Sequence, residues 1–419
     1  MKTLFLSTNS FPHNDRETLL GPKIQLLSEK FNRIYVLTAT PKTSVEIFIP
    51  KNVSSFYVDT RLNVIDKIRA FLGIFSLLFF QEIIDLKTLK ISMNWKKIKV
   101  ALNAMYISKR YSRVVRQIVN KNNLLTDKLF FHAYWCAEFP ICFSELKNSF
   151  PHAHFSTRMH AYDLYEERHN PNYLPFRKLI FSVCDKLFFI SKQGKNYFKK
   201  KYHIENDSKL IVNYLGVIKS TTLKLEKSKF VSNESELVLV SCSSMIGLKR
   251  IHLIIDCLSK IKNINIRWYH FGDGSLKEQL ELAAYQKLNE LTHISYFFQG
   301  HVSNELINAF YAMNHVDLFI NVSQYEGVPI SMMEAMSFGV PCIGTNVGGV
   351  KEIINHENGY LLDVNFNIDD LAKIMVDYSS KNVLNRLKYK EGANTTFENR
   401  FQLKKNIEVL IKILFEEKH

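Results

Sequence analysis

The chain has 419 residues, of which 46% are apolar and 23% are charged. This length exceeds the size at which one hydrophobic core keeps growing, so we expect a folded protein of two domains. The six cysteines show no C-x-x-C pair and no recurring spacing, which argues against a disulfide framework and against a zinc site. A reducing cytoplasm is therefore the expected location.

The formal net charge of +15 suggests an anionic partner, which would be a nucleic acid, a phosphorylated substrate or an acidic lipid. The alternative is a chain rich in lysine throughout, with its lysines on solvated faces. We find no RNP-like aromatic strand, no zinc finger and no helix-turn-helix pattern, so no nucleic acid partner is expected.

The apolar runs of the chain are short. The first, in residues 2–6, breaks at Ser7-Thr8-Asn9 and predicts a strand rather than a signal peptide. The longest uncharged run, AFLGIFSLLFF at 70–80, has 11 residues, against the roughly 20 needed to span a bilayer. It predicts either a core helix or, with Lys67, Arg69 and the basic segment 109–116, a surface that rests on an anionic membrane.

Two segments open in the same way, with an apolar strand, a polar loop and an amphipathic helix. Strands that alternate with helices indicate parallel, doubly wound sheets, so the predicted fold class is α/β with two Rossmann-like domains. The predicted domains are 1–218 and 219–398, with a linker at 219–234 and a C-terminal helix at 399–419 that packs back on the first domain. The predicted strands, with their polar ends, lie within 2–8, 33–39, 128–135, 153–163, 186–194, 236–243, 265–274, 317–327 and 341–349, and the first helix of each domain lies at 23–31 and 252–261.

Polar residues at the carboxyl ends of these strands are the candidate ligands, because an open α/β sheet binds its ligands in the crevice beyond those ends. Loops from both domains are expected to converge on one crevice. These loops are 9–17, 158–163, 243–249, 272–274, 300–302, 324–334 and 345–349.

The segment 321–341 places one charged residue on an otherwise apolar helix between Pro329 and Gly339. No side of this helix is plainly solvent-facing, so we predict that the carboxylate of Glu334 is buried or half-buried. A buried carboxylate needs hydrogen-bond donors. Glu334 would either form an internal salt bridge or cap a neighbouring loop, or it would accept hydrogen bonds from the vicinal hydroxyls of a ribose. Glu326 would face the same crevice, and the helix start at 328–331 between the two carboxylates is suited to a diphosphate.

Three further features are weaker when each is taken alone. Gly348-Gly349 at another helix start permits close approach of the backbone to a ligand, although such a pair is more often a plain turn. Lys249 could place a point charge on the same diphosphate, or lie on the surface. His160 could donate to a phosphate or to a sugar hydroxyl, or have a structural role.

Together these residues resemble the retaining glycosyltransferases of family 4. EGVPISMMEAMSFGVPCIGTNVGGVKEII at 326–354 is similar to the family signature of two glutamates with seven residues between them. SCSSMIGLKRIHLII at 241–255 is similar to the strand, loop, lysine and helix that open the nucleotide-binding half. HFGDG, QGHVSNEL, TRMHAYDLYEER, NYLGV and FENRFQLKKNIEVLIKIL match further family elements in the expected order.

The resemblance implies a GT-B fold in which the second domain holds most of the donor. Glu326 would bind hydroxyls of the donor sugar, and Glu334 would bind the ribose. Lys249 and the helix start would bind the diphosphate, so that no metal and no cofactor are expected, and His160 would act near the reacting centre. The other residues implied are Gly327, Val328, Ser331, Ser244, Arg250, Gly272, Gly274, Gly300, Val302, Gly348 and Gly349 on the donor side and Glu17, Arg158 and Asp163 on the acceptor side.

The chain departs from the family pattern at two places. Ser244 stands where family members usually have an arginine five residues before the lysine, so Arg250 is a candidate for its role. The loop SFPHNDRET lacks the paired glycines often found there.

The function that the resemblance implies is metal-independent, retaining transfer of a sugar from a UDP- or GDP-sugar to a saccharide acceptor. The acceptor would be lipid-linked, in the synthesis of a bacterial O-antigen, capsule or exopolysaccharide, with the enzyme in the cytoplasm or peripheral on the inner face of the plasma membrane. The alternatives are an epimerase or phosphorylase of the same fold, and a non-catalytic protein that binds membranes or anions.

Overall fold

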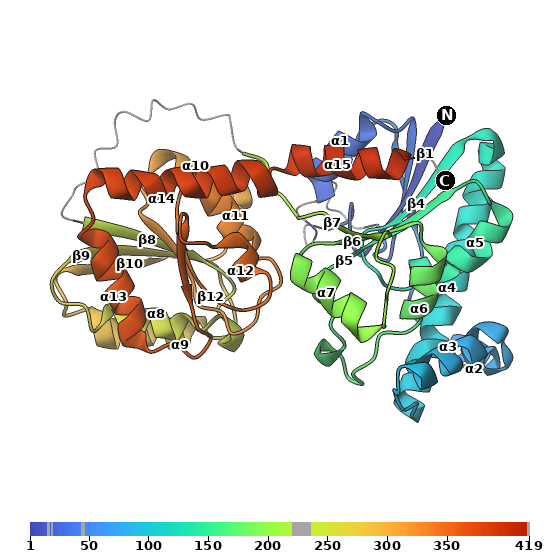
Figure 1. Cartoon of the computed structure of the whole chain (residues 1–419), viewed down its shortest axis with the longest axis horizontal. Helices are drawn as coiled ribbons and strands as arrows, with labels where there is room; N and C mark the ends of the chain where they lie inside the picture. Colours follow the sequence, from blue (N-terminus) through green and yellow to red (C-terminus); the bar gives the residue numbers. More distant parts are fainter. Residues whose placement is uncertain (15–16, 18–19, 43–46, 220–235, 417–419) are drawn as a thin grey trace. The chain divides into compact units, whose positions relative to one another are not determined.

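The computed structural model describes residues 1–14, 17, 20–42, 47–219 and 236–416 (Figure 1). Its contacts divide the chain into two compact units: unit 1 is Met1–Tyr214 with Lys404–His419, and unit 2 is Leu215–Leu403. The predicted domain ends at 218 and 398 lie near these divisions. The predicted linker 219–234 lies, apart from its first residue, outside the described residues.

Unit 1 is built on a seven-stranded sheet in the order β3-β2-β1-β4-β5-β6-β7. Every neighbouring pair of strands is parallel. The central strands are buried on both faces, as a parallel sheet covered by helices requires, and this is why they form continuous apolar runs in the sequence. The strands are β1 Lys2–Thr8, β2 Arg33–Thr38, β3 Val53–Tyr57, β4 Lys128–Ala133, β5 His154–Met159, β6 Lys186–Phe189 and β7 Leu210–Val212.

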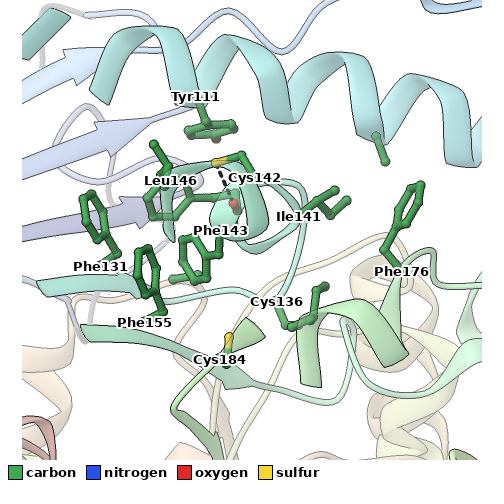
Figure 2. Close-up of a cluster of buried hydrophobic side chains, with 14 of the residues drawn as sticks. Tyr111, Phe131, Cys136, Ile141, Cys142, Phe143, Leu146, Phe155, Phe176 and Cys184 are labelled. Carbon is green, nitrogen blue, oxygen red and sulfur yellow. Dashed lines mark hydrogen bonds between the residues drawn. The ribbon is translucent and has the colours of Figure 1, made fainter. Parts of the chain in front are cut away.

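Stacked aromatic rings mark the face of this sheet that α4 and α5 cover (Figure 2). Phe131 stacks against Phe5 and Phe155, and Phe143 of α5 packs on the same rings. On the other face Phe130 contacts Phe415 of α15. The helices are α1 Leu20–Ser28, α2 Val64–Phe71, α3 Leu77–Thr88, α4 Trp95–Lys121, α5 Phe143–Ser149, α6 Arg177–Val183, α7 Lys192–Lys201 and, from the far end of the chain, α15 Leu403–Phe415.

Unit 2 is built on a six-stranded parallel sheet in the order β10-β9-β8-β11-β12-β13. The strand order reverses between β8 and β11, and this is the position where open α/β sheets bind ligands. The strands are β8 Glu236–Cys242, β9 Asn265–Phe271, β10 Ile294–Phe298, β11 Leu318–Asn321, β12 Cys342–Thr345 and β13 Gly359–Leu362.

Helices cover both faces of the unit 2 sheet. Trp268 is buried in one core with side chains of α8, α9 and α13. On the other face, Phe310 of α10 packs edge-on against Tyr269 and Phe271. The helices are α8 Ile251–Leu258, α9 Lys277–Leu288, α10 Asn304–Met313, α11 Ile330–Ser337, α12 Val350–Ile353, α13 Ile368–Ser379 and α14 Val383–Thr396.

Two sequence expectations concern cross-links and membrane spans. All six cysteines are free, which confirms that the chain has no disulfide framework. No helix in the described part of the chain combines the length and the apolar character needed to cross a bilayer.

The C-terminal helix α15 completes the core of unit 1, because the Phe415 ring packs edge-on against Phe31 and tilted against Phe130. We expect Phe415→Ala to lower the free energy of unfolding of unit 1 by about 2 kcal/mol, since a half-buried ring leaves a partial cavity. Hydrogen–deuterium exchange of the β1 and β4 peptides measures this unit separately. Val409→Ala, an exposed position of the same helix, is the matched control and should change little; equal effects of the two variants would contradict this packing.

Candidate functional site

An ion pair between Lys249 and Glu326 joins two loops at the carboxyl edge of the unit 2 sheet. Lys249 ends the 3-10 helix Gly247–Lys249 that follows β8, and Glu326 lies in the loop after β11. Nζ of Lys249 donates to Oε1 of Glu326 at 2.5 Å. Because β8 and β11 are adjacent strands, the sheet itself brings the two charges together. Two residues that the resemblance assigns to the donor therefore lie in direct contact.

Further polar groups hold the same carboxylate. Nδ2 of Asn321 lies 3.1 Å from Oε1 of Glu326, and the hydroxyl of Ser323 lies 2.8 Å from it. The main-chain N–H of Gln324 donates to the carbonyl of Leu248 at 2.8 Å, which closes the loop. No group among the described residues donates to Oε2 of Glu326. Oε1 of Glu326 is therefore held in place by three donors, and Oε2 is available to a hydroxyl group of a ligand.

The predicted pair Gly348-Gly349 packs its backbone against this loop. Gly348 has a φ of +52°, and a Cβ there would lie 1.8 Å from the carbonyl oxygen of Glu326. The main-chain N–H of Gly349 donates to the carbonyl of Gly327 at 2.6 Å. Only glycine permits this approach of two backbones. The sequence suggested contact of the pair with a ligand, whereas the structure shows contact with the segment that carries Glu326.

Helix α11 lies between Pro329 and Gly339, as the sequence predicts. Pro329 has an extended ψ of 117° and is the N-cap, and Gly339 follows the end of the helix with a φ of +76°. Proline has no side chain that could cap the helix, and no side-chain cap bond is formed. The first-turn N–H groups, including that of Ser331, are therefore not occupied by a cap, and they give this end a partial positive charge.

Glu334 lies on the buried face of α11, as the sequence predicts, with 7% of its surface exposed. Burial raises the pKa of this carboxyl to about 7, and no nearby cation opposes the shift. Within the part of the chain that the structure describes, no group donates a hydrogen bond to the carboxylate and no cation pairs with it. The internal salt bridge that the sequence left open is therefore not formed by these residues.

Glycines also shape the loops after β9 and β10. Gly272 has a φ of +139°, and a Cβ there would lie 2.0 Å from the carbonyl oxygen of Ser243. A Cβ on Gly274 would meet the backbone of Met245 at 2.6 Å. The N–H of Gly272 donates to the carbonyl of Gly300 at 2.8 Å, two residues before Val302. These predicted residues therefore hold the loops after three neighbouring strands together.

Arg250 has structural partners. Its Nε donates to the carbonyl of Val322 and its Nη1 to the carbonyl of Val364, both at 2.7 Å. These bonds tie the start of α8 to the ends of β11 and β13. Nη2 is buried without a partner among the described residues, and Ser244 is exposed. Two N–H groups of Arg250 are therefore already engaged. That Arg250 takes the role of the arginine that Ser244 replaces stays a prediction.

Four predicted site residues belong to unit 1, and the structure brings them to one end of its sheet. They are Glu17, Arg158, His160 and Asp163. Glu17 accepts bonds from the main-chain N–H groups of Ser10 and Phe11, both at 2.7 Å, and from the indole of Trp135. The Trp135 ring lies 4.2 Å from that of His160. Glu17 therefore positions a loop and a ring.

The hydrogen bond that holds His160 comes from its main chain, and its ring Nδ1 lies 3.9 Å from Oδ2 of Asp163. Its N–H donates to Asp163 at 2.5 Å, and Asp163 also accepts from the N–H of Cys136. Burial lowers the pKa of His160, and Asp163 opposes that shift. Both ring nitrogens are buried, and neither has a hydrogen-bond partner within the described residues.

Lys23 is a buried cation that the sequence reasoning missed. Its Nζ lies 4.6 Å from the centre of the Tyr134 ring, and burial, with Arg158 nearby, lowers its pKa well below the usual value. Arg158 donates to the side-chain and main-chain oxygens of Asn213. The sequence could have indicated this burial, because Lys23 lies one turn before Leu27 on the apolar face of α1.

Asn321 and Ser323 were also missed, because neither residue type is distinctive at a strand end.

Among the described residues, no three His, Cys, Asp or Glu side chains lie together so that they could hold a metal ion.

The buried carboxyl of Glu334 makes a pH-dependent contribution to stability. Its raised pKa means that the folded state holds a proton that the unfolded state releases, so stability falls as pH rises from about 4.5 to about 7. Relative to Glu334→Gln, we expect the wild-type free energy of unfolding to fall by about 3 kcal/mol between pH 4.5 and pH 8. Urea-dependent hydrogen exchange of β11 and β12 measures this difference. Glu278→Gln, at an exposed position of α9, is the control; a Glu334→Gln profile parallel to wild type would refute the shift.

Comparisons with known proteins agree with this geometry. Residues 224–395 match the family model described as glycosyl transferases group 1. N-acetyl-alpha-D-glucosaminyl L-malate synthase of Bacillus anthracis is 32% identical over 142 residues, which are 33% of this chain and 35% of that protein. The O-antigen biosynthesis glycosyltransferase WclY of Escherichia coli is 25% identical over 53% of this chain and 59% of its own.

The chain thus spans between 30% and 59% of the length of the first curated relatives it matches. A solved structure of Anabaena HepE in complex with UDP-glucose covers 99% of both chains with a TM-score of 0.58 at 14% identity. That likeness extends to both parallel sheets and shows the fold. Residues 224–395 thus match the family model of the glycosyl transferases group 1, and the chain has the GT-B fold.

Proposed function

We propose that the protein is a retaining, metal-independent glycosyltransferase of family 4 that uses a nucleotide-diphosphate sugar. The observation that carries the proposal is the pair of carboxylates on either side of the uncapped start of α11. Glu326 has one oxygen fixed by Lys249 and the other open. Glu334 is buried without a protein partner among the described residues. A sugar, a diphosphate and a ribose supply the hydroxyls and the charge that these groups lack.

The donor is a UDP- or GDP-sugar. The solved HepE complex holds UDP-glucose, which favours UDP as the first nucleotide to test. A ribose diol donates to Glu334 and compensates its burial, so nucleotide binding is expected to lower the pKa of this carboxyl.

The chemistry depends on the leaving group. Transfer passes through an oxocarbenium-like centre, and the charge that develops on the departing diphosphate is the largest quantity to stabilise. Lys249 and the first-turn N–H groups of α11 supply that stabilisation. Glu326 orients the donor sugar and is not the nucleophile. The acceptor attacks on the face that the diphosphate leaves and passes its proton to that diphosphate, while His160 hydrogen-bonds near the reacting centre.

The acceptor is a saccharide, and we infer that it is lipid-linked and belongs to a bacterial surface polysaccharide. The relative WclY acts in O-antigen biosynthesis by its name. A lipid-linked acceptor brings the enzyme to the cytoplasmic face of the membrane. Glu17, Arg158 and Asp163 serve the acceptor side by positioning the loops of unit 1.

Substitution at the ion pair tests the proposal. We expect Lys249→Ala and Glu326→Gln each to lower donor hydrolysis or transfer about 100-fold or more in the presence of EDTA, because each removes a preorganised contact to charge or to sugar. The readout is release of nucleoside diphosphate from a panel of UDP- and GDP-sugars.

Lys260→Ala is the matched control, since Lys260 also pairs with a carboxylate of unit 2, at 2.7 Å from Asp369, but lies on an exposed face. It should keep wild-type turnover. Full activity of both site variants would show that the site is wrongly assigned, and loss of all activity in EDTA would contradict metal independence. Product analysis without acceptor separates transfer from epimerisation.

A further inference from the structure

Helix α2 has its polar and apolar faces reversed relative to an ordinary surface helix. Its buried residues are Asp66 and Ala70, one turn apart. Asp66 is held by Arg110 of α4 at 2.8 Å and by the hydroxyl of Tyr106 at 2.9 Å. The opposite face, with Ile65 and Ile68, is exposed. A helix that packs through its carboxylate leaves its apolar face without a partner.

The segment after α2 continues the exposed apolar surface. Residues 70–80, for which the sequence left open a core helix or a membrane-facing surface, form three pieces: the end of α2, the 3-10 helix Leu72–Phe75, which has no buried residue, and the start of α3. Phe75 is 77% exposed and Leu77 is 88% exposed. Phe80 and Ile84 follow Leu77 at helical spacing and are exposed as well, while Phe79, Glu82 and Leu86 hold α3 to the protein.

The exposed residues lie together on unit 1. The Phe71 ring at the end of α2 lies 6.0 Å from that of Trp95, which begins α4 and is 62% exposed. The 3-10 helix Leu72–Phe75 joins α2 to α3, and α2 packs on α4. We call this region, from Val64 to Ile84 with Trp95, the α2–α3 surface. Exposed apolar patches of this kind mark binding surfaces.

The segment that carries the α2–α3 surface is rich in basic residues, and one of its acids pairs with a cation. Residues 61–99 contain eight lysines and arginines against three acids. Two of the acids are buried: Asp66 pairs with Arg110, and Glu82 accepts from the hydroxyl of Tyr173 at 2.6 Å. Lys67, Arg69, Lys87, Lys90, Lys96 and Lys99 are exposed. The surface therefore presents apolar side chains within a positive field.

The basic segment 109–116, which the sequence joined to this surface, is different. Arg110 pairs with Asp66, and Arg116 with Glu145 at 3.0 Å. Two of its four cations are therefore engaged within the protein.

We propose that the α2–α3 surface docks on an anionic lipid bilayer, with its aromatic and aliphatic side chains in the headgroup region and its lysines and arginines at the lipid phosphates. Apolar residues next to clustered cations and an exposed Trp are what an interfacial segment requires. This deepens the proposed function by naming the partner of unit 1, and it rests on that function only for the location of the acceptor.

Vesicle co-sedimentation of the full chain tests the proposal. Wild type should bind vesicles of phosphatidylcholine with one-third phosphatidylglycerol at least tenfold more tightly than vesicles of phosphatidylcholine alone, and added salt should weaken this preference. Phe75→Glu/Leu77→Glu should weaken binding about 100-fold, because two apolar anchors become charged. Lys67→Gln/Arg69→Gln should weaken it about tenfold.

Leu384→Glu is the matched control, because Leu384 is an equally exposed apolar residue, at 71%, on α14 of unit 2. It should bind as wild type does. Equal binding by Phe75→Glu/Leu77→Glu and wild type would overturn the proposal. A wild-type dimer in gel filtration that this variant converts to a monomer, without vesicle binding, would instead assign the surface to a second copy of the chain. Donor hydrolysis without acceptor should be unchanged in the variant, so failure here is distinct from failure of the catalytic proposal.

Discussion

The ion pair between Lys249 and Glu326 is the constraint on which the candidate site depends. It neutralises a mostly buried carboxylate, joins the loop after β8 to the loop after β11, and leaves one carboxylate oxygen of Glu326 without a donor among the described residues. The pair exists because adjacent parallel strands end at one edge of the sheet. Gly348 and Gly349 keep the loop in place by backbone contact. A diphosphate arriving at the start of α11 would compete with Glu326 for Lys249, which couples donor binding to the position of this loop.

The two glutamates differ in their electrostatic surroundings. Glu326 has a cation and two neutral donors, and it stays where the loop holds it. Glu334 pairs with no cation and no donor among the described residues, and its burial raises its pKa to about 7, which makes it costly to ionise in the free protein. A ligand that donates two hydroxyls removes that cost. Under the proposed function, the cost of ionising Glu334 in the free protein is the counterpart of its affinity for the donor, as at binding sites where stability is lost for function.

Much of the fold follows from the sequence because buried parallel strands appear as apolar runs with polar ends. The burial of Glu334 also follows, since no side of its helix is plainly solvent-facing. The direct contact of Lys249 with Glu326, 77 positions apart, could not be predicted, because it depends on the strand order. The orientation of α2 could not be predicted either: its periodicity shows two faces, and the carboxylate face is buried because Arg110 and Tyr106, much further along the chain, bind Asp66.

The central claim is that the carboxyl edge of the unit 2 sheet binds a nucleotide-diphosphate sugar. Hydrogen–deuterium exchange of the full chain, with and without millimolar UDP, GDP and their sugars, tests it most directly. The account predicts that at least one of these ligands slows exchange in the peptides that contain 324–334 and 345–350, and that Lys249→Ala weakens this protection. Protection confined to other segments, or no protection by any of the ligands, would contradict the account.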